Sequence, residues 1–243
     1  MKSALVTGGS RGIGLGIATR LAELGYGLTI TARSSDALSA VAEDLTAGGA
    51  PQVETVAADL ADRDAADLIV DAHRSAFGSM DVLVLNAGVG TAGTIADYPM
   101  RRFDKTLDVN VRAPFQILQN SIPLLRTAVE ANPSGGAKVL ALASLAGVYS
   151  ESGLAVYGAT KAAMLSLIDT LNAEESGNGI TGTSIAPGYV DTDMSDWTKD
   201  TISSESMIRV NDIVELATGV LRLSAQAVVP RIVVTRAGAG LGA

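Results

Sequence analysis

The sequence contains no cysteine and only one histidine among its 243 residues. The lack of cysteine excludes disulfides and thiolate chemistry, and nothing in it points to secretion. A single histidine excludes a metal site built from several histidines, and we expect no bound metal. That histidine, His73, stands in the charged helical stretch DAHR at 71–74, which predicts a position on the protein surface.

Basic residues and long apolar runs are also scarce. Lys and Arg number 18 against 26 Asp and Glu, a net charge of −8, so the basic footprint of a nucleic-acid-binding protein is missing. No apolar run approaches the roughly 18 residues of a membrane span. Thr7-Gly8-Gly9 interrupts any signal-peptide core. We therefore expect a cytoplasmic protein with neither nucleic acid nor membrane as a partner.

Apolar residues and glycine, by contrast, are plentiful, at 47% hydrophobic content and 26 glycines. Short apolar runs alternate with helical stretches, which predicts a parallel sheet covered by helices on both faces. We predict one doubly wound (Rossmann) α/β domain over residues 1–243, with about seven strands. The expected strands lie at 4–6, 28–31, 53–57, 82–85, 139–143, 183–186 and 232–234. After the first turn, helices are expected at about 34–45, 62–77, 101–131, 156–175 and 213–223.

A glycine-rich turn, TGGSRGIG at 7–14, follows the first expected strand and precedes residues at helical spacing. Such a turn aims backbone N–H groups at one point, and the helix N-terminus adds partial positive charge there. The glycines follow a TGxxxGxG pattern, because Ile17 stands where the strict GxGxxG spacing requires glycine. A turn that needs glycines for geometry alone is the alternative. We expect a nucleotide-phosphate site.

The end of the second expected strand indicates which dinucleotide binds. Enzymes that select NAD commonly place a carboxylate there, but this chain has Ala32 followed by Arg33. Asp36 suits the first turn of a helix instead. Arg33 and Arg11 are able to hold a 2′-phosphate between two guanidinium groups. The alternative is a pair of solvated surface arginines. We predict NADP(H) as the cofactor.

Tyr157 and Lys161 are four residues apart, on one face of an expected helix. A neighbouring ammonium favours the phenolate and lowers the pKa of the tyrosine, which makes it a usable proton donor. Alone, such a pair is more often a feature of a helix surface. Ser144 strengthens the catalytic interpretation because it ends an apolar strand, at the sheet edge where α/β proteins bind ligands. Asn86-Ala87-Gly88 and Pro187-Gly188 also follow strands, although either alone suits an ordinary turn.

These motifs stand in the order TGGSRGIG, Asp59-Leu60, LNAG at 85–88, DVNV at 108–111, Ser144, YGATK and PGYVDT at 187–192. In this order they resemble the short-chain dehydrogenase/reductase superfamily, in its single-domain branch. Within that branch the chain is most similar to 3-oxoacyl-carrier-protein reductases and related ketoreductases. The resemblance implies an NADP(H)-dependent oxidoreductase that transfers the pro-S hydride between nicotinamide and a carbonyl or secondary alcohol substrate.

The resemblance also implies roles for four residues. Tyr157 would donate the proton in reduction, and Lys161 would lower its pKa and bind the nicotinamide ribose. Ser144 would hydrogen-bond the substrate oxygen, and Asn110 would hold a water in a relay to Lys161. With the residues already discussed, the expected cofactor contacts are Gly8, Ser10, Arg11, Gly12, Ile13, Gly14, Arg33, Ser34, Asp59, Leu60, Asn86, Ala87, Gly88, Val109, Tyr157, Lys161, Pro187, Gly188, Val190 and Thr192.

The chain departs from the family pattern in three places. Leu85 stands where a second Asn is frequent, and Ala113 where glycine is frequent. The C-terminus reads VVPRIVVTRAGAGLGA, without the usual glycine pair after an acidic residue. That segment helps to build a subunit interface in the family. We expect a homo-oligomer, a tetramer or a dimer.

The segment 191–209 shows no clear period and is expected to form a substrate lid. Its apolar residues either contact an apolar substrate or pack the lid onto the core; they are Met194, Trp197, Ile202, Met207 and Ile208. Two other function classes stay open. A non-catalytic NADP(H) sensor would need the glycine turn but not the catalytic set. A Rossmann-fold methyltransferase would make the Tyr157–Lys161 spacing a coincidence.

Overall fold

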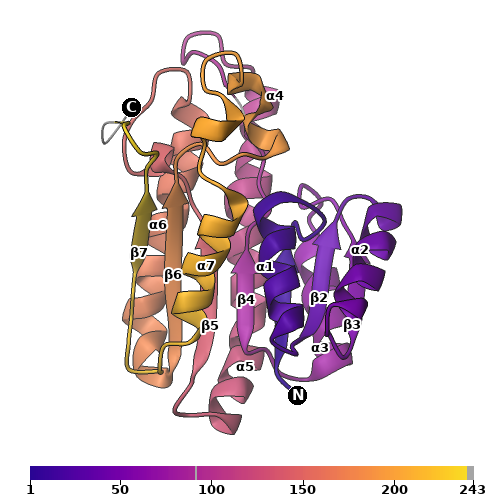
Figure 1. Ribbon diagram of the computed structural model, residues 1–243. Coiled ribbons are helices and arrows are strands. Elements are labelled where there is room, and N and C mark those ends of the chain that lie inside the picture. The colour runs from indigo at the N-terminus through magenta and orange to yellow at the C-terminus, as the bar shows by residue number, and fades with distance from the viewer. Residues whose placement is uncertain (91, 240–243) are drawn as a thin grey trace.

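The seven strands pair side by side in the order β3-β2-β1-β4-β5-β6-β7, and every pair is parallel (Figure 1). The computed structural model describes residues 1–90 and 92–239. The strands are β1 (Ser3–Thr7), β2 (Gly27–Ala32), β3 (Val53–Ala57), β4 (Val82–Leu85), β5 (Ala137–Leu142), β6 (Ile180–Pro187) and β7 (Arg231–Val234). The order reverses between β1 and β4, where α/β sheets open a crevice for ligands.

Seven α-helices accompany the strands within the described residues: α1 (Gly12–Glu23), α2 (Ser35–Ala47), α3 (Ala65–Phe77), α4 (Met100–Leu107), α5 (Ala113–Ala131), α6 (Ala155–Glu175) and α7 (Val210–Leu221). The central strand shows how they divide. Leu5 of β1 packs with α3, α5 and α6, whereas Ala4 and Val6 pack with α1, α2 and α7. Successive strand residues point to opposite faces, so an entirely apolar strand requires cover on both. The predicted doubly wound fold is confirmed.

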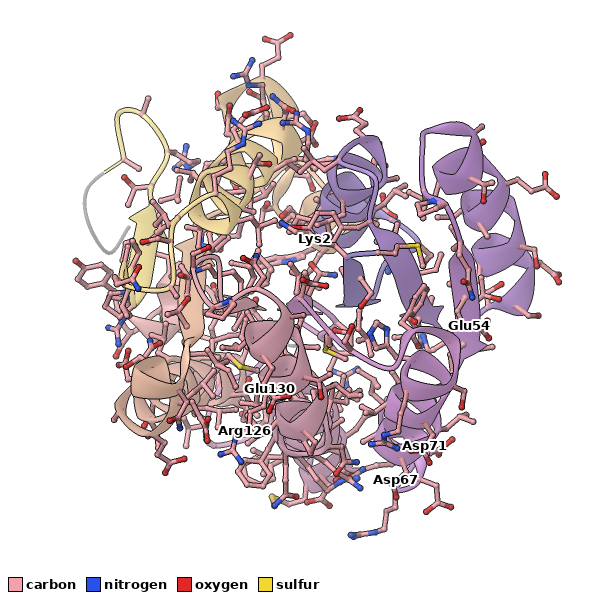
Figure 2. All side chains as sticks on the ribbon, turned by 90° about the horizontal axis from the view of Figure 1, so that it is seen from below. Lys2, Glu54, Asp67, Asp71, Arg126 and Glu130 are labelled. Atoms are coloured by element: carbon pink, nitrogen blue, oxygen red, sulfur yellow. The ribbon has the colours of Figure 1, made fainter. Side chains whose placement is uncertain are left out.

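The outer surfaces of α3 and α5 carry charged side chains. Figure 2, seen from below, shows Asp67 and Asp71 on α3 and Arg126 and Glu130 on α5, all four of them exposed. No helix within 1–90 and 92–239 combines the length and apolarity needed to cross a membrane.

Several boundaries differ from the predicted ones for local reasons. The helix expected from residue 62 begins at Ala65, because Asp62–Asp64 form a turn in which Ala65 N donates to Asp62 O. The last helix begins at Val210, where the Asp212 side chain accepts hydrogen bonds from the Arg209 backbone N and guanidinium. The helix predicted at 101–131 contains a π-helical turn, Asp108–Arg112, between α4 and α5.

The predicted surface position of His73 is wrong. Its side chain is fully buried, where Nδ1 lies 2.8 Å from Thr29 Oγ1 and Nε2 lies 3.0 Å from Ser79 O. Burial lowers the pKa of the imidazole to about 4. The charged neighbours in the sequence point away from the core on the outer face of α3, so their polarity says nothing about His73.

Candidate active site

One cleft runs across the carboxyl ends of the strands. Its walls come from the residues that follow β1, β2, β3, β4, β5 and β6, and from the segment after Pro187. All strand arrows point toward this edge in Figure 1. Because parallel strands end at the same edge, residues from six distant stretches of sequence meet there.

The glycine turn forms one wall of the cleft, and its geometry requires glycine. Gly12 has a positive φ of 56°, which other residues rarely adopt. A Cβ on Gly14 would lie 2.2 Å from Gly8 O and 2.3 Å from Asn86 Nδ2. Asn86 Nδ2 donates to the carbonyls of Thr7 and Gly8 at 3.0 Å each, so its side chain fixes the turn from behind. The turn leads directly into α1, as a phosphate site requires.

The end of β2 carries no carboxylate in the cleft wall. Ala32, Arg33 and Ser34 line the cleft there, and Arg33 is exposed. The Ser34 side chain accepts from Ala37 N at 3.3 Å and thereby caps α2. Asp36 lies in the first turn of α2, as predicted. The charged group that this wall presents at the end of β2 is therefore the Arg33 guanidinium.

Arg11, the predicted partner of Arg33, has a different partner in this structure. Its Nη1 donates to Asp193 Oδ2 at 2.7 Å, and both side chains are largely exposed. A Cβ on Gly12 would also contact the Thr192 methyl group at 3.4 Å. The glycine turn and the predicted lid therefore touch each other.

Tyr157, Lys161 and Ser144 meet on the opposite side of the cleft. The first two are one turn apart on α6, and Ser144 follows β5. Lys161 Nζ donates to Leu142 O at 2.6 Å and lies 5.7 Å from the centre of the Tyr157 ring. An ammonium has three donor hydrogens, and this bond uses one of them.

The expected pKa shift of Tyr157 needs correction. In this structure burial raises the pKa of the Tyr157 phenol, and a hydrogen bond with Ser144 offsets part of that rise. Burial also lowers the pKa of Lys161 to about 8. The Lys161 ammonium stays mostly protonated at neutral pH, but its bond is to the Leu142 carbonyl rather than to the phenol oxygen.

Asn110 lies on the π-helical turn and is buried. Its Oδ1 accepts from Val89 N at 2.9 Å, while Nδ2 donates to Val89 O at 3.0 Å and Thr160 Oγ1 at 3.1 Å. A Cβ on Gly88 would lie 3.3 Å from Asn110 Oδ1 and 3.4 Å from Lys161 Nζ. The Asn110 amide therefore ties the loop that follows β4 to α6, directly behind the cleft wall.

The cleft brings together nearly all of the predicted site residues. Those that line it are Gly8, Ser10, Arg11, Gly12, Ile13, Arg33, Ser34, Asp59, Leu60, Asn86, Ala87, Gly88, Val109, Ser144, Tyr157, Lys161, Pro187, Gly188, Val190 and Thr192. Gly14 and Asn110 are the two exceptions. Both lie one layer deeper, where they support residues of the wall.

Several cleft residues escaped the sequence reasoning, among them Glu151, Tyr189 and Arg236. Glu151 belongs to a loop with no recognisable pattern, whereas Tyr189 lies within the PGYVDT motif but was not among the residues expected to contact the cofactor. The unusual C-terminal stretch was noticed, but only in connection with subunit contacts. Arg102 and Lys105, on α4, also line the cleft mouth.

The predicted lid contains two short helical turns, Asp193–Thr198 and Ser204–Ser206. Its apolar residues divide into two groups. Met207 and Ile208 are buried, and Ile202 is half-buried. Met194 and Trp197 line the cleft and are 46% and 61% exposed, so these two are available to a substrate.

Comparison with known proteins agrees with this geometry. Residues 2–202 match the family model for short chain dehydrogenases. The chain is 35% identical over 211 residues to the Staphylococcus aureus 3-oxoacyl-acyl-carrier-protein reductase FabG, covering 86% of this chain and 82% of that protein.

Two solved structures extend the comparison to three dimensions. A short chain dehydrogenase from Burkholderia cenocepacia in complex with NADP is 33% identical, with a TM-score of 0.85 over 100% of this chain and 98% of the other. A Brucella melitensis 3-oxoacyl-acyl-carrier-protein reductase in complex with NAD is 27% identical, with a TM-score of 0.84 over 96% and 94%. A nicotinamide dinucleotide is thus the ligand of both relatives. The chain belongs to the short-chain dehydrogenase/reductase family.

Proposed function

We propose that this protein is an NADP(H)-dependent oxidoreductase that interconverts a carbonyl compound and the corresponding secondary alcohol. The observation that carries the proposal is the meeting of Ser144, Tyr157 and Lys161 in one cleft, across from the glycine turn. A non-catalytic NADP(H) sensor would need the turn but not these three side chains. They make catalysis the better proposal.

In this mechanism the Ser144 hydroxyl donates a hydrogen bond to the substrate carbonyl oxygen. The Tyr157 hydroxyl gives its proton to the same oxygen, and Lys161 stabilises the phenolate that is left. A bound nicotinamide supplies the hydride that reduces the carbonyl carbon. Asn110 acts as a positioning residue. Its amide donates to Val89 O, in the cleft wall, and to the side chain of Thr160, the residue before Lys161.

NADP(H) is the proposed cofactor because of the end of β2. The cleft wall there offers the exposed Arg33 guanidinium and the N-terminus of α2, and no carboxylate that would repel a 2′-phosphate. Gly8, Gly12 and Ile13 would hold the pyrophosphate at the start of α1. Asp59, Leu60 and Val109 would flank the adenine, and Pro187, Gly188, Val190 and Thr192 the nicotinamide.

A 3-oxoacyl thioester is a substrate class consistent with the S. aureus relative. We further propose that residues 191–209 act as the substrate lid of a single domain, with Met194 and Trp197 facing the substrate. We also propose that the protein is a homo-oligomer and that it acts in the cytoplasm.

The test is a panel of ketones, aldehydes and 3-oxoacyl thioesters, followed by the loss of NADPH absorbance and repeated with NADH. We expect turnover of at least one ketone or thioester, with a higher kcat/KM for NADPH than for NADH. Tyr157→Phe serves as the inactive control. NADPH binding without turnover of any carbonyl would favour the sensor.

A further inference from the structure

Arg236 lies in the cleft at a place that the chemistry above does not use. It stands two residues beyond the end of β7, and Gly188 N donates to Val234 O at 2.8 Å, which holds that end against the residues after β6. The side chain is half-buried and lines the same cleft as Ser144 and Tyr157. The segment that follows β7 thus contributes a guanidinium to the cleft that holds Ser144 and Tyr157.

No ion pair or side-chain hydrogen bond involves Arg236 among residues 1–90 and 92–239. The other cleft arginines differ from it. Arg11 is paired with Asp193, and Arg33 and Arg102 are exposed to solvent. Partial burial removes water from a guanidinium, and that loss is favourable only when an anion replaces the water.

Tyr189 and Glu151 line the cleft together with Arg236. Tyr189 OH donates to Glu151 Oε1 at 2.8 Å, which uses one of the acceptor positions of that carboxylate. Burial raises the pKa of the Tyr189 phenol, Glu151 and Tyr157 raise it further, and the positive charge of Arg236 lowers it. Arg236 and Tyr157, the proposed proton donor, line the same cleft as Tyr189.

We propose that Arg236 binds a carboxylate of the substrate, so that the protein prefers oxo acids and hydroxy acids to neutral ketones and alcohols. This inference rests on the proposed function. A guanidinium binds a carboxylate through two parallel hydrogen bonds, which fixes the orientation of the substrate as well as its charge. Glu151, Asp191 and Asp193 also line the cleft, and their negative charges disfavour any substrate carboxylate that does not pair with Arg236.

The experiment compares oxo acids with their methyl esters, with the carboxylate one, two or three carbons from the carbonyl. The same NADPH assay is applied to the unmodified protein and to Arg236→Ala. Arg231→Ala is the matched control, because Arg231 begins β7, the strand that leads to Arg236, but lies outside the cleft and pairs with Asp169.

We expect the unmodified protein to prefer one acid over its ester. Arg236→Ala should lower kcat/KM for that acid roughly 10- to 100-fold, while the value for the ester changes by less than about threefold. The KM for NADPH should stay unchanged, and Arg231→Ala should leave both substrates unaffected. An equal loss on acid and ester, no preference for any acid, or a raised KM for NADPH would overturn the proposal.

Failure of the proposed function is a separate outcome, visible as no turnover of any acid or ester by the unmodified protein. In that case calorimetry measures binding of the hydroxy acids and their esters in the presence of NADP. Binding of an acid but not its ester, lost in Arg236→Ala, supports the carboxylate site. Equal binding of acid and ester overturns it.

Discussion

Lys161 and His73 are both buried side chains whose pKa is lowered by burial, yet they lie at opposite ends of the sheet. Lys161 is at the carboxyl ends of the strands and lines the cleft. His73 lies beside Ser3 and Ser79, at the amino ends of β1 and β4, where neutral partners meet both of its ring nitrogens.

Lys161 and His73 differ in their access to a ligand and in their unused hydrogen-bonding capacity. Within the described residues Lys161 Nζ donates one hydrogen bond, and Lys161 lines a cleft that a ligand can enter. Both ring nitrogens of His73, by contrast, have protein partners and the side chain is fully buried. Burial and a shifted pKa are therefore common to a catalytic site and to a structural one. A catalytic site differs from a structural one in that a ligand can reach the buried group and form further hydrogen bonds with it.

Removing the proton donor at the cleft tests one side of this comparison. Tyr157→Phe should lower kcat by roughly 10²- to 10⁴-fold, because the ring keeps its packing but loses the hydroxyl. The Kd for NADPH should stay within about threefold, because the glycine turn provides the phosphate contacts. Tyr149→Phe is the control, since Tyr149 is outside the cleft. A Tyr157→Phe protein with near-normal turnover would falsify the assignment of the acid.

Titrating the opposite end of the sheet tests the other side. The pKa of His73 is lowered to about 4 in the folded state against 6.5 in the unfolded state, so the unfolded chain binds the proton first. The stabilisation by neutral His73 is present above pH 6.5 and is lost as the pH falls toward 4. The free energy of unfolding should fall by about 2 kcal/mol between pH 7 and 5.

Urea unfolding over a pH series measures this change. His73→Gln should be less stable at pH 7 and should lose most of the dependence between pH 7 and 5, while activity at neutral pH persists in the folded fraction. Equal pH dependence in the two proteins would assign the slope to other groups.

Arg33→Ala should affect the cofactor alone. We expect the Kd for NADPH to rise roughly 10- to 100-fold, through loss of a charge-assisted contact to the 2′-phosphate, with little change for NADH. Arg101→Ala is the control, because Arg101 is exposed but outside the cleft. Equal dissociation constants for NADPH and NADH in the unmodified protein would refute the preference.

The smallest effect concerns the lid. Saturating NADPH should slow proteolysis within 191–209 roughly five- to tenfold, because closing the site excludes water from the reaction. Asp193→Asn, which breaks the contact with Arg11, should speed cleavage in the free protein. Identical cleavage with and without NADPH would identify the segment as a fixed loop.

The sequence by itself was enough to predict the alternation of strands and helices, the glycine turn and the order of the family motifs. Each strand, helix and motif depends on residues that are close together in the sequence, and the order of the motifs is read directly along the chain. The apolar runs of β1, β4 and β5 predict strands because they are buried on both faces. Tyr157 and Lys161 were found for the same reason, since four residues along a helix bring them to one face.

Only the tertiary structure decided the burial of His73, the partner of Arg11 and the place of Arg236. Arg11 and Asp193 are 182 residues apart, and His73 binds partners on two strands. Gly14 and Asn110, which the sequence predicted at the cleft surface, lie in the layer behind it. Such contacts depend on how distant elements pack, and no local periodicity or spacing reports on that packing.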